Sequence, residues 1–338
     1  MNRVLRILRL LLWPFGIDVR RRNTHNLRPY LQPFKNASNF TVLATVRDYF
    51  VSDDDLHEPR TADINILKIC FRTCLTTQRA GKGHGMVAGA SLPETVARCF
   101  LTLIRSVNLA AQLDPTLAIE VMIIDDHSED SLINPIKTLA QRLACPWRFH
   151  TPAVRGPGAS LYEQFGFAAD DNALYYFCED DYLHDERAIF EMVKFYQQLF
   201  SLTGRHVVLA PQEHELLYGD CQYPSYLVVS PYRHWRSCSH ATHVLFTHAH
   251  TVQKYWRFFE NTKFVSNRKK RHLGSEKRTT NLLFNHVPCF APLPALAGHF
   301  QTPDLLPPVF NWRALWDAND PAKLPPLSPS GLPLSHLV

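Results

Sequence analysis

Two apolar segments that each end in carboxylates constrain this chain more than any other feature. The stretch 175–183 reads YYFCEDDYL, a run of strand-forming aromatic residues that leads into Glu179, Asp180 and Asp181. The stretch 121–130 reads VMIIDDHSED and carries Asp125 and Asp126 at the end of a second apolar run. Their separation of about fifty residues is typical of successive strand and helix units. Parallel strands in such units end at one edge of a sheet, so we expect both acidic ends to share one cleft.

The three adjacent carboxylates at 179–181 repel one another, and a bound cation relieves that repulsion. Hard oxygen ligands suit Mn²⁺ or Mg²⁺, particularly when phosphate oxygens complete the coordination shell. The alternative for an isolated Glu-Asp-Asp is a solvated strand end or the acidic start of the next helix. The second acidic strand end favours a shared cation site.

Size and composition indicate a globular protein with one large domain. The chain has 338 residues, of which 46% are hydrophobic, enough for a sizeable core. The net charge of +5 is uneven, because Arg residues gather in 3–22 and the run RKKR occupies 268–271. Such clusters point to anionic partners, either lipid head groups or phosphates. Nucleic acid is not an expected partner, since the clusters are peripheral and belong to no recognisable module.

The cysteines and the N-terminus bear on localisation. The eight cysteines are scattered without a Cys-x-x-Cys pair, and several lie in apolar runs, which favours a reducing cytosol. No apolar run reaches the roughly 18 to 20 residues of a membrane span. The pattern of Arg and apolar residues in 1–15 predicts an amphipathic helix that lies on an anionic membrane surface. The alternatives are a helix packed on the protein's own body or a poor signal sequence. We therefore expect a cytoplasmic protein, peripheral at the inner face of a membrane.

The pattern along the chain predicts four parts. After the helix at 1–15 come a linker or N-terminal extension (16–62), an α/β domain (63–300, with halves 63–184 and 185–300) and a Pro-rich docking segment and tail (301–338). Strands are expected at 64–73, 121–126, 147–150 and 205–210, and helices at about 132–143 and 185–200. Ser91 with Glu94 forms a capping box that predicts a helix start.

A second capping box is predicted at Ser160 and Glu163, after the turn-forming sequence GPGA at 156–159. The start of that helix would face the acidic edge. Free amides around Gly158 and Ser160 would then suit a nucleotide's hydroxyls or phosphates. A capped helix without a ligand is the alternative meaning of the same pattern.

In order and spacing, four segments of the chain resemble the family-two glycosyltransferases with the nucleotide-sugar-binding GT-A fold. They are CFRTC (70–74), IIDDHSED (123–130), GPGAS (156–160) and EDD (179–181), the last in place of the family's Asp-x-Asp. The resemblance covers about residues 64–290. It implies an α/β fold of GT-A type, a mostly parallel sheet flanked by helices, and a nucleotide-diphosphate sugar as the donor.

The resemblance also implies roles for the residues of these motifs. Arg72 and Thr73 lie beside the nucleoside, and either Asp125 or Asp126 accepts a hydrogen bond from the base. Glu179 and Asp180 face the ribose and the diphosphate, while Asp181 ligates the Mn²⁺ or Mg²⁺ that bridges the two phosphates. A cation there stabilises the charge that develops on the departing nucleoside diphosphate. Glu in place of the first Asp departs from the family pattern and leaves the role of Glu179 less defined than that of Asp181.

Inverting members of the family use a carboxylate to deprotonate the acceptor hydroxyl. The segment 274–277 (GSEK) resembles the late Glu-Asp motif, but Lys277 stands where the family usually has its catalytic aspartate. Glu276 and His243 are the catalytic residues we select. The other candidates are Glu213, Glu215, Asp220 and His240.

The expected function is metal-dependent transfer of a sugar, with inversion, to a glycan or lipid-linked acceptor in the synthesis of a surface polysaccharide or glycolipid. One alternative is a sugar nucleotidyltransferase, which would need a Gly-rich motif directly after the first strand. Another is a catalytically degenerate GT-A-fold protein that serves as a binding module or scaffold, a reading that Lys277 favours.

Overall fold

The computed structural model describes residues 11–12, 41–43, 62–77, 86–213, 227–238 and 240–326. The strands are β1 (Thr41–Leu43), β2 (Ile66–Thr73), β3 (Ala118–Asp125), β4 (Trp147–His150), β5 (Leu174–Glu179), β6 (Tyr182–His184), β7 (Val208–Leu209), β8 (Leu227–Val229), β9 (His234–Cys238), β10 (Leu245–His248), β11 (Cys289–Leu293) and β12 (Ala297–His299). From residue 62 onward, the described α-helices are α4 (Leu92–Leu113), α5 (Asp130–Ala140), α6 (Pro157–Gly166), α7 (Ala188–Thr203), α9 (Ala249–Lys254), α10 (Trp256–Phe259), α11 (Thr280–Leu283) and α12 (Trp312–Ala318). Short 3₁₀ helices are η3 (Glu260–Phe264), η4 (Arg271–Leu273), η5 (Glu276–Arg278), η6 (Pro303–Leu305) and η7 (Pro321–Lys323).

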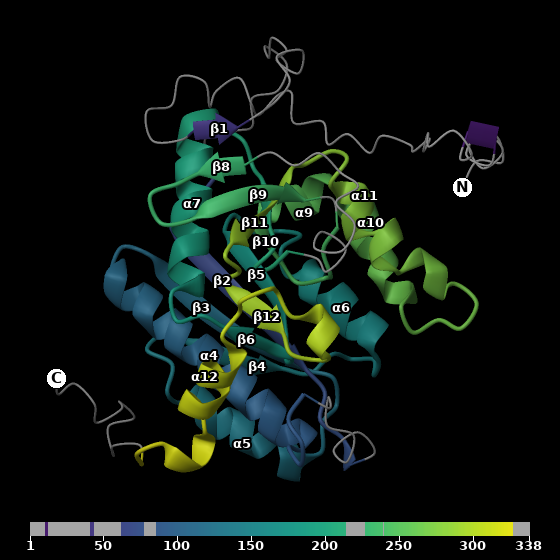
Figure 1. Ribbon diagram of the computed structural model, residues 1–338. Helices are drawn as coiled ribbons and strands as arrows, with labels where there is room; N and C mark the ends of the chain where they lie inside the picture. The colour runs from purple at the N-terminus through teal and green to yellow at the C-terminus, as the bar shows by residue number, and fades with distance from the viewer. Residues whose placement is uncertain are drawn as a thin grey trace.

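A large sheet lies at the centre and helices cover both of its faces (Figure 1). Its strand order within the described residues is β1-β8-β9-β11-β7-β10-β5-β2-β3-β4. The strands β5, β2, β3 and β4 are all parallel. In the other half of the sheet, from β10 onward, the pairs are antiparallel except for β7 with β11, which are parallel. The expected α/β fold of GT-A type is confirmed, and its parallel part is the half that carries both acidic strand ends.

The register of the parallel strands brings the two acidic ends to one edge. Thr73 at the end of β2 pairs with Asp125 of β3, and Arg72 pairs with Glu179 of β5. The carboxyl ends of β3 and β5 therefore flank the end of β2 at the same level. This follows from sequence, because each of the three strands is a buried run of apolar residues that ends at a polar one.

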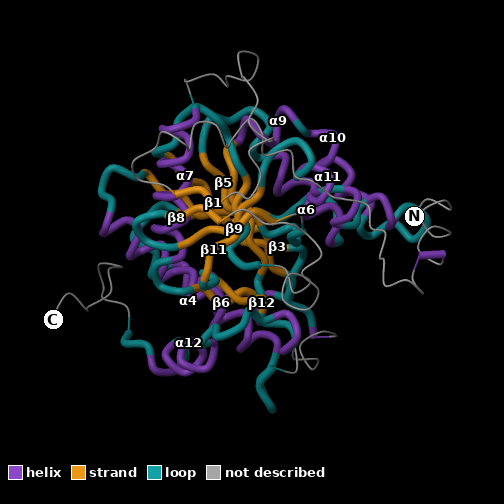
Figure 2. Tube along the Cα trace, turned by 45° about the horizontal axis from the view of Figure 1, so that its top comes forward, coloured by secondary structure: helices purple, strands orange, loops and turns teal. Residues whose placement is uncertain are grey.

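Alternate residues of the parallel strands point into two apolar layers. On one face, Ile69 and Phe71 belong to the cluster that α4, α5 and α7 cover. On the other face, Cys70 and Met122 pack with α6 and with α9 to α11. The tube in Figure 2 shows the strands in the middle of the molecule with helices around them. Helix α4 begins as predicted, since the Ser91 side chain accepts a hydrogen bond from the backbone amide of Glu94 at 3.3 Å.

Helix α6 begins earlier than the sequence predicted. It starts at Pro157 with Gly156 as its N-cap, and Gly156 has a φ of +128° that favours glycine. Ser160 lies one turn inside the helix, where its hydroxyl donates to the carbonyl of Pro157. The Glu163 carboxylate accepts instead from the backbone amide of Ala153 and contacts His150. The prediction of a second capping box at Ser160 and Glu163 is therefore wrong.

A separate two-stranded sheet brings the C-terminal part of the domain to the acidic edge. Strand β12 pairs antiparallel with β6, so that His299 lies opposite Tyr182. The backbone amide of Phe300 also donates to the carbonyl of Asp181 at 2.6 Å. Residues 297–301 are thus fixed directly beside the acidic triplet, although more than a hundred residues separate them in the chain.

After β12 the chain returns along α4. Both views show α12 beside α4 (Figures 1 and 2). Trp316 of α12 is buried against Phe300, with the rings 5.1 Å apart, and the Arg98 guanidinium of α4 lies 4.5 Å from the Trp316 ring. Most of the predicted N-terminal helix at 1–15, most of the linker at 16–62 and the tail after residue 326 lie outside the described residues. In the part of the chain that is described, no helix is both long and apolar enough to cross a bilayer.

Candidate active site

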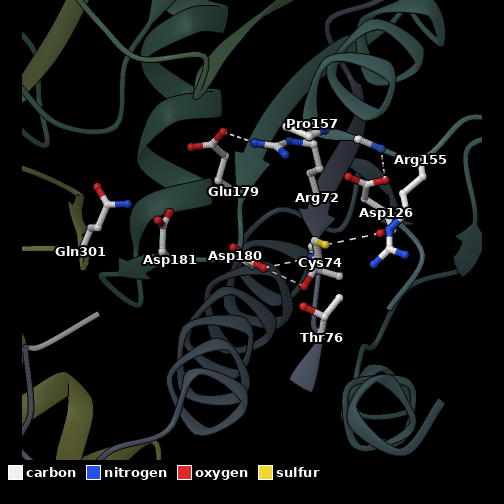
Figure 3. Close-up of a pocket in the computed structure, with 12 residues that line it drawn as sticks. Arg72, Cys74, Thr76, Asp126, Arg155, Pro157, Glu179, Asp180, Asp181 and Gln301 are labelled. Atoms are coloured by element: carbon white, nitrogen blue, oxygen red, sulfur yellow. Dashed lines mark hydrogen bonds and ion pairs between the residues drawn. The ribbon is translucent and has the colours of Figure 1, made fainter. Parts of the chain in front are cut away.

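A cleft of about 470 Å³ opens at the carboxyl edge of the parallel strands. It draws residues from the ends of β2, β3 and β5, from the start of α6 and from the segment after β12. The lining residues are Arg72, Thr73, Cys74, Thr76, Asp126, Arg155, Gly156, Pro157, Glu179, Asp180, Asp181 and Gln301. Figure 3 shows Asp181 and Gln301 toward one end of the cleft and Asp126 and Arg155 toward the other. The expectation that both acidic strand ends share one cleft is met.

The end of β2 is tied to the acidic triplet by two side-chain contacts. The Arg72 guanidinium forms an ion pair with the Glu179 carboxylate (Figure 3). The Thr73 hydroxyl donates to Asp180 Oδ2 at 2.7 Å, and the Cys74 amide donates to the same oxygen at 3.3 Å. These contacts hold two of the three carboxylates in place across the strand ends.

The structure separates the two acids that follow β3. Asp126 lines the cleft, and its Oδ1 accepts a hydrogen bond from the Gly156 amide at 2.7 Å. Asp125 is buried and does not line the cleft; its Oδ2 accepts from the Ser128 amide at 3.0 Å and so closes the turn after the strand. Burial raises the pKa of Asp125. Of the alternatives that the sequence left open, Asp126 is the one positioned to meet a ligand.

His299 joins the acidic triplet, and sequence reasoning missed it. Its Nε2 lies 3.2 Å from Asp181 Oδ2, and its ring stacks on Tyr182 at 4.7 Å with the planes 7° apart. Among the described residues, Glu179, Asp181 and His299 form a group whose potential ligand atoms all lie within 4.8 Å of one another. A single histidine in the segment AGHF gives no sequence signal, because only the pairing of β12 with β6 brings it here.

The donor atoms of this group fit a divalent cation. Two carboxylates supply hard oxygens and His299 supplies an imidazole nitrogen, a set that Mn²⁺ accepts more readily than Mg²⁺. The charge distribution fits as well: burial, and then the negative charge of Asp181, raise the pKa of Asp180 to about 6. Three carboxylates so close together are stabilised by a cation between them.

Gly158 and Ser160 do not line the cleft, although the sequence assigned their amides to a nucleotide. The Gly158 amide donates to the Ser266 hydroxyl at 2.9 Å, and the Ser160 amide donates to the carbonyl of Gly156 at 3.1 Å. Gly156 and Pro157 line the cleft in their place, because α6 starts at Pro157. The amides of Gly158 and Ser160 are therefore occupied within the protein, and the Gly156 amide is held by Asp126.

The two catalytic residues selected from sequence lie next to each other. The distance between His243 Nδ1 and Glu276 Oε1 is 3.7 Å, and His243 Nε2 lies 3.0 Å from the Thr279 hydroxyl. Burial lowers the pKa of His243, and the negative charge of Glu276 opposes that effect. Glu179 and Arg72, which line the cleft, also act on the pKa of His243 through their charges. Neither His243 nor Glu276 lines the cleft itself.

Of the other candidates for the base, Glu213 is buried and pairs with Arg236 at 3.2 Å. Glu215 and Asp220 lie outside the described residues.

Fold and cleft together define the class of protein: a GT-A-type α/β protein with a carboxylate-lined cleft at the carboxyl ends of its parallel strands. Residues 90–210 match the model of glycosyl transferase family 2. This match covers three of the four motifs that carry the resemblance, at 123–130, 156–160 and 179–181, and agrees with it. A search of curated proteins finds no significant match.

Solved structures with a related arrangement include three whose likeness is loose. The first, S. aureus TarS, is 13% identical with a TM-score of 0.35, and the alignment covers 64% of this chain and 33% of that chain. The galactosyltransferase LgtC, solved with donor and acceptor sugar analogs, is 11% identical with a TM-score of 0.36, over 64% of this chain and 70% of that one. UDP-glucose pyrophosphorylase with UDP-glucose is 9% identical with a TM-score of 0.38, over 75% and 98%. The family-model match is confined to residues 90–210.

Proposed function

We propose that this protein transfers a sugar from a nucleotide-diphosphate sugar to a glycan or lipid-linked acceptor, with inversion and with the help of Mn²⁺ or Mg²⁺. The observation that carries the proposal is the cleft in which Asp126, the acidic triplet and His299 converge. Its position at the carboxyl edge of a parallel sheet is where nucleotides bind in open α/β folds.

In this proposal the nucleoside occupies the end of the cleft near Asp126. The Asp126 carboxylate, already held by the Gly156 amide, accepts a hydrogen bond from the base. Arg72 and Thr73 line the same wall and orient Glu179 and Asp180 toward the ribose and diphosphate. Fixed groups of this kind need little rearrangement when the donor binds.

Asp181, His299 and Glu179 would hold the cation at the diphosphate end. A bound cation supplies charge stabilisation to the nucleoside diphosphate as it leaves. Residues of the chain keep this ligand set in place: Tyr182 stacks on the His299 ring, and the Gln212 side chain accepts a hydrogen bond from the His299 backbone amide at 2.6 Å.

The base that deprotonates the acceptor hydroxyl is assigned to Glu276, with His243 as its neighbour. Glu276 is half-exposed and therefore accessible to an acceptor, whereas His243 is buried. Burial lowers the pKa of His243 and so favours its neutral imidazole, which can help to hold the Glu276 side chain in place. Glu276→Gln should lower turnover of donor with acceptor by about 10²-fold or more while leaving donor binding unchanged.

Hydrolysis of UDP-, GDP- and dTDP-sugars in the presence of Mn²⁺ tests the proposal. We expect slow hydrolysis of one donor by the wild type and none after Asp181→Ala, with the fold retained. No turnover with any donor, together with no thermal shift on adding any nucleotide, would favour the scaffold alternative. Wild-type activity in Asp181→Ala would remove the metal assignment.

We also propose that the protein works at the cytosolic face of a membrane. The support is the amphipathic pattern of residues 1–15, in which Arg3, Arg6 and Arg9 share one flank. Deletion of residues 1–15 should release the protein from vesicles that contain anionic lipid. Unchanged sedimentation of the shortened protein with those vesicles would contradict this anchor.

A further inference from the structure

Residues 254–278 are here called the basic segment. Their Lys and Arg side chains have no part in the donor chemistry described above. The segment contains nine Lys and Arg residues and two Glu residues, so it carries a charge of +7. The whole chain carries +5, which leaves −2 for all the other residues together. All nine cationic residues are exposed. The basic segment and the Arg-rich stretch 3–22 therefore carry the positive charge of this chain, and the remaining residues are acidic overall.

The middle of the basic segment is fixed against the rim of the cleft. The Gly158 amide donates to the Ser266 hydroxyl, and a Cβ at Gly158 would lie 2.8 Å from the carbonyl oxygen of Lys263. A Cβ at Gly156, which lines the cleft, would lie 3.4 Å from the Ser266 hydroxyl. The segment thus packs closely on the start of α6, and its location beside the cleft is built into the fold.

The C-terminal end of the basic segment carries the proposed base. Glu276 contacts His243, and Lys277 and Arg278 follow it directly. The turn between the middle of the segment and this end is tight, because a Cβ at Gly274 would lie 2.6 Å from the backbone nitrogen of Val265. In Figure 1 this part of the chain follows α10 and leads to α11, next to α6. A molecule that extends from the cleft to Glu276 would therefore pass along the basic segment.

The chemistry of the segment favours a water-soluble polyanion over a lipid surface. All residues from 254 to 278 are described, and no large apolar side chain among them is strongly exposed. Docking on a bilayer usually adds apolar side chains that enter the interface. A row of exposed Lys and Arg without such side chains attracts a chain of negative charges and releases its counterions.

We propose that the basic segment binds an acceptor glycan that bears repeated negative charges, such as phosphate or carboxylate groups, and guides it between the donor cleft and Glu276. This inference rests on the proposed function, because it names the chemical class of the acceptor. The segment supplies affinity and position, while the cleft supplies the donor.

Binding of short-chain inorganic polyphosphate to the full-length protein tests this inference, with neutral dextran as the uncharged comparison. We expect affinity for polyphosphate that falls steeply with salt, and none for dextran. The variant Arg268→Glu/Lys269→Glu/Arg271→Glu should bind polyphosphate at least about 10-fold more weakly. The matched control Arg148→Glu/Arg313→Glu/Lys323→Glu makes the same change in net charge at exposed sites elsewhere and should stay within about threefold of the wild type.

Three results would overturn the inference: no binding of polyphosphate by the wild type at low salt, equal losses in both variants, or a loss in the first variant that affects anionic vesicles but not polyphosphate. The last result would instead make the segment a membrane contact. Polyphosphate binding is measured without donor, so it fails independently of the proposed function. Donor hydrolysis without polyphosphate binding refutes this inference alone, whereas polyphosphate binding without donor hydrolysis refutes the proposed function and, with it, the acceptor role of the segment.

Discussion

Asp180 lies between groups that act on its pKa in opposite directions. Burial and the charge of Asp181 raise that pKa to about 6, while the hydrogen bond from Thr73 lowers it. The folded protein therefore binds more protons than the unfolded chain between about pH 4 and 6, and its stability falls as pH rises through that window. A divalent cation favours the ionised carboxylates and opposes this loss.

The first prediction follows from this titration. Mn²⁺ should raise the melting temperature more at about pH 7.5 than at about pH 5, because protons compete with the ion for the carboxylates at the lower pH. Differential scanning fluorimetry with and without Mn²⁺ measures both shifts. An equal Mn²⁺ effect at the two pH values would contradict the assignment of the ion to this carboxylate group.

The second prediction concerns Asp181→Asn. Removing one of three neighbouring negative charges should leave the metal-free melting temperature equal or higher, and it should abolish the rise that Mn²⁺ produces. Asp170→Asn, which makes the same change at an exposed position, is the control and should keep the Mn²⁺ effect. A normal Mn²⁺ effect in Asp181→Asn would show that the ion binds elsewhere.

The individual cleft residues show how much of the site the sequence predicted. The resemblance to the glycosyltransferase motifs pointed to Arg72, Thr73 and Asp126, and all three line the cleft. Whether Asp125 or Asp126 faces the cleft depends on the turn that Ser128 closes, which the pattern does not encode. His299 is 118 positions from Asp181 and reaches it only through strand pairing.

At the scale of elements, the start of α6 joins the cleft to the basic segment. Gly158→Ala should destabilise the protein and displace the basic segment, since the added Cβ would lie 2.8 Å from a backbone oxygen. We expect a loss of about 1–3 kcal/mol in the free energy of unfolding. Gly166→Ala in the same helix has no atom within 4 Å and should be neutral or slightly stabilising. Equal urea midpoints for Gly158→Ala and wild type would contradict the close packing.

Helix α12 supports the residues beside the cation site. Trp316 packs on Phe300, which follows His299, and Arg98 donates to the Trp316 carbonyl at 2.7 Å. Trp316→Ala should cost about 3–5 kcal/mol of stability and weaken Mn²⁺ binding, because the cavity loosens the segment that carries His299. Urea unfolding and Mn²⁺ titration measure the two effects, with the exposed Leu113→Ala as control. Unchanged Mn²⁺ affinity in a folded Trp316→Ala would contradict this supporting role.

The elements that sequence predicted well are those with local signals. The strands β2, β3 and β4 and the helix start at Ser91 follow from apolar runs and a capping box. The pairs β6 with β12 and β7 with β11 join segments far apart in the chain, and their strands are too short to show a period. The predicted start of α6 is too late. Ser160 and Glu163 have the spacing of a capping box, but the helix already begins at Pro157 with Gly156 as its N-cap.

At the scale of the whole molecule, buried histidines make stability depend on pH. Burial lowers the pKa of His184 to about 3, of His206 to about 2 and of His248 to about 4. The unfolded chain takes up protons at these positions near pH 6.5 and the folded protein does not, so stability is lost as pH falls below that value. The loss is roughly 2 kcal/mol for each histidine at about pH 5.

Urea unfolding at about pH 7.5 and about pH 5 tests this dependence. The double variant Tyr196→Phe/His206→Phe, which removes a buried histidine together with the hydroxyl that hydrogen-bonds to it, should reduce the difference attributed to the three histidines by about a third. A difference between the two pH values that is the same in the double variant and in the wild type would mean that His206 is not held neutral.

The whole account depends on a cation and a nucleoside diphosphate sharing the cleft between Asp126 and Asp181. A crystal structure with Mn²⁺ and UDP, or with the nucleotide selected by the hydrolysis assay, tests it most directly through anomalous scattering from the ion. We expect one manganese peak in bonding contact with Asp181 and His299, with the diphosphate on its other side and the base toward Asp126. A nucleotide bound outside this cleft, or a manganese peak that neither Asp181 nor His299 contacts, would contradict the account.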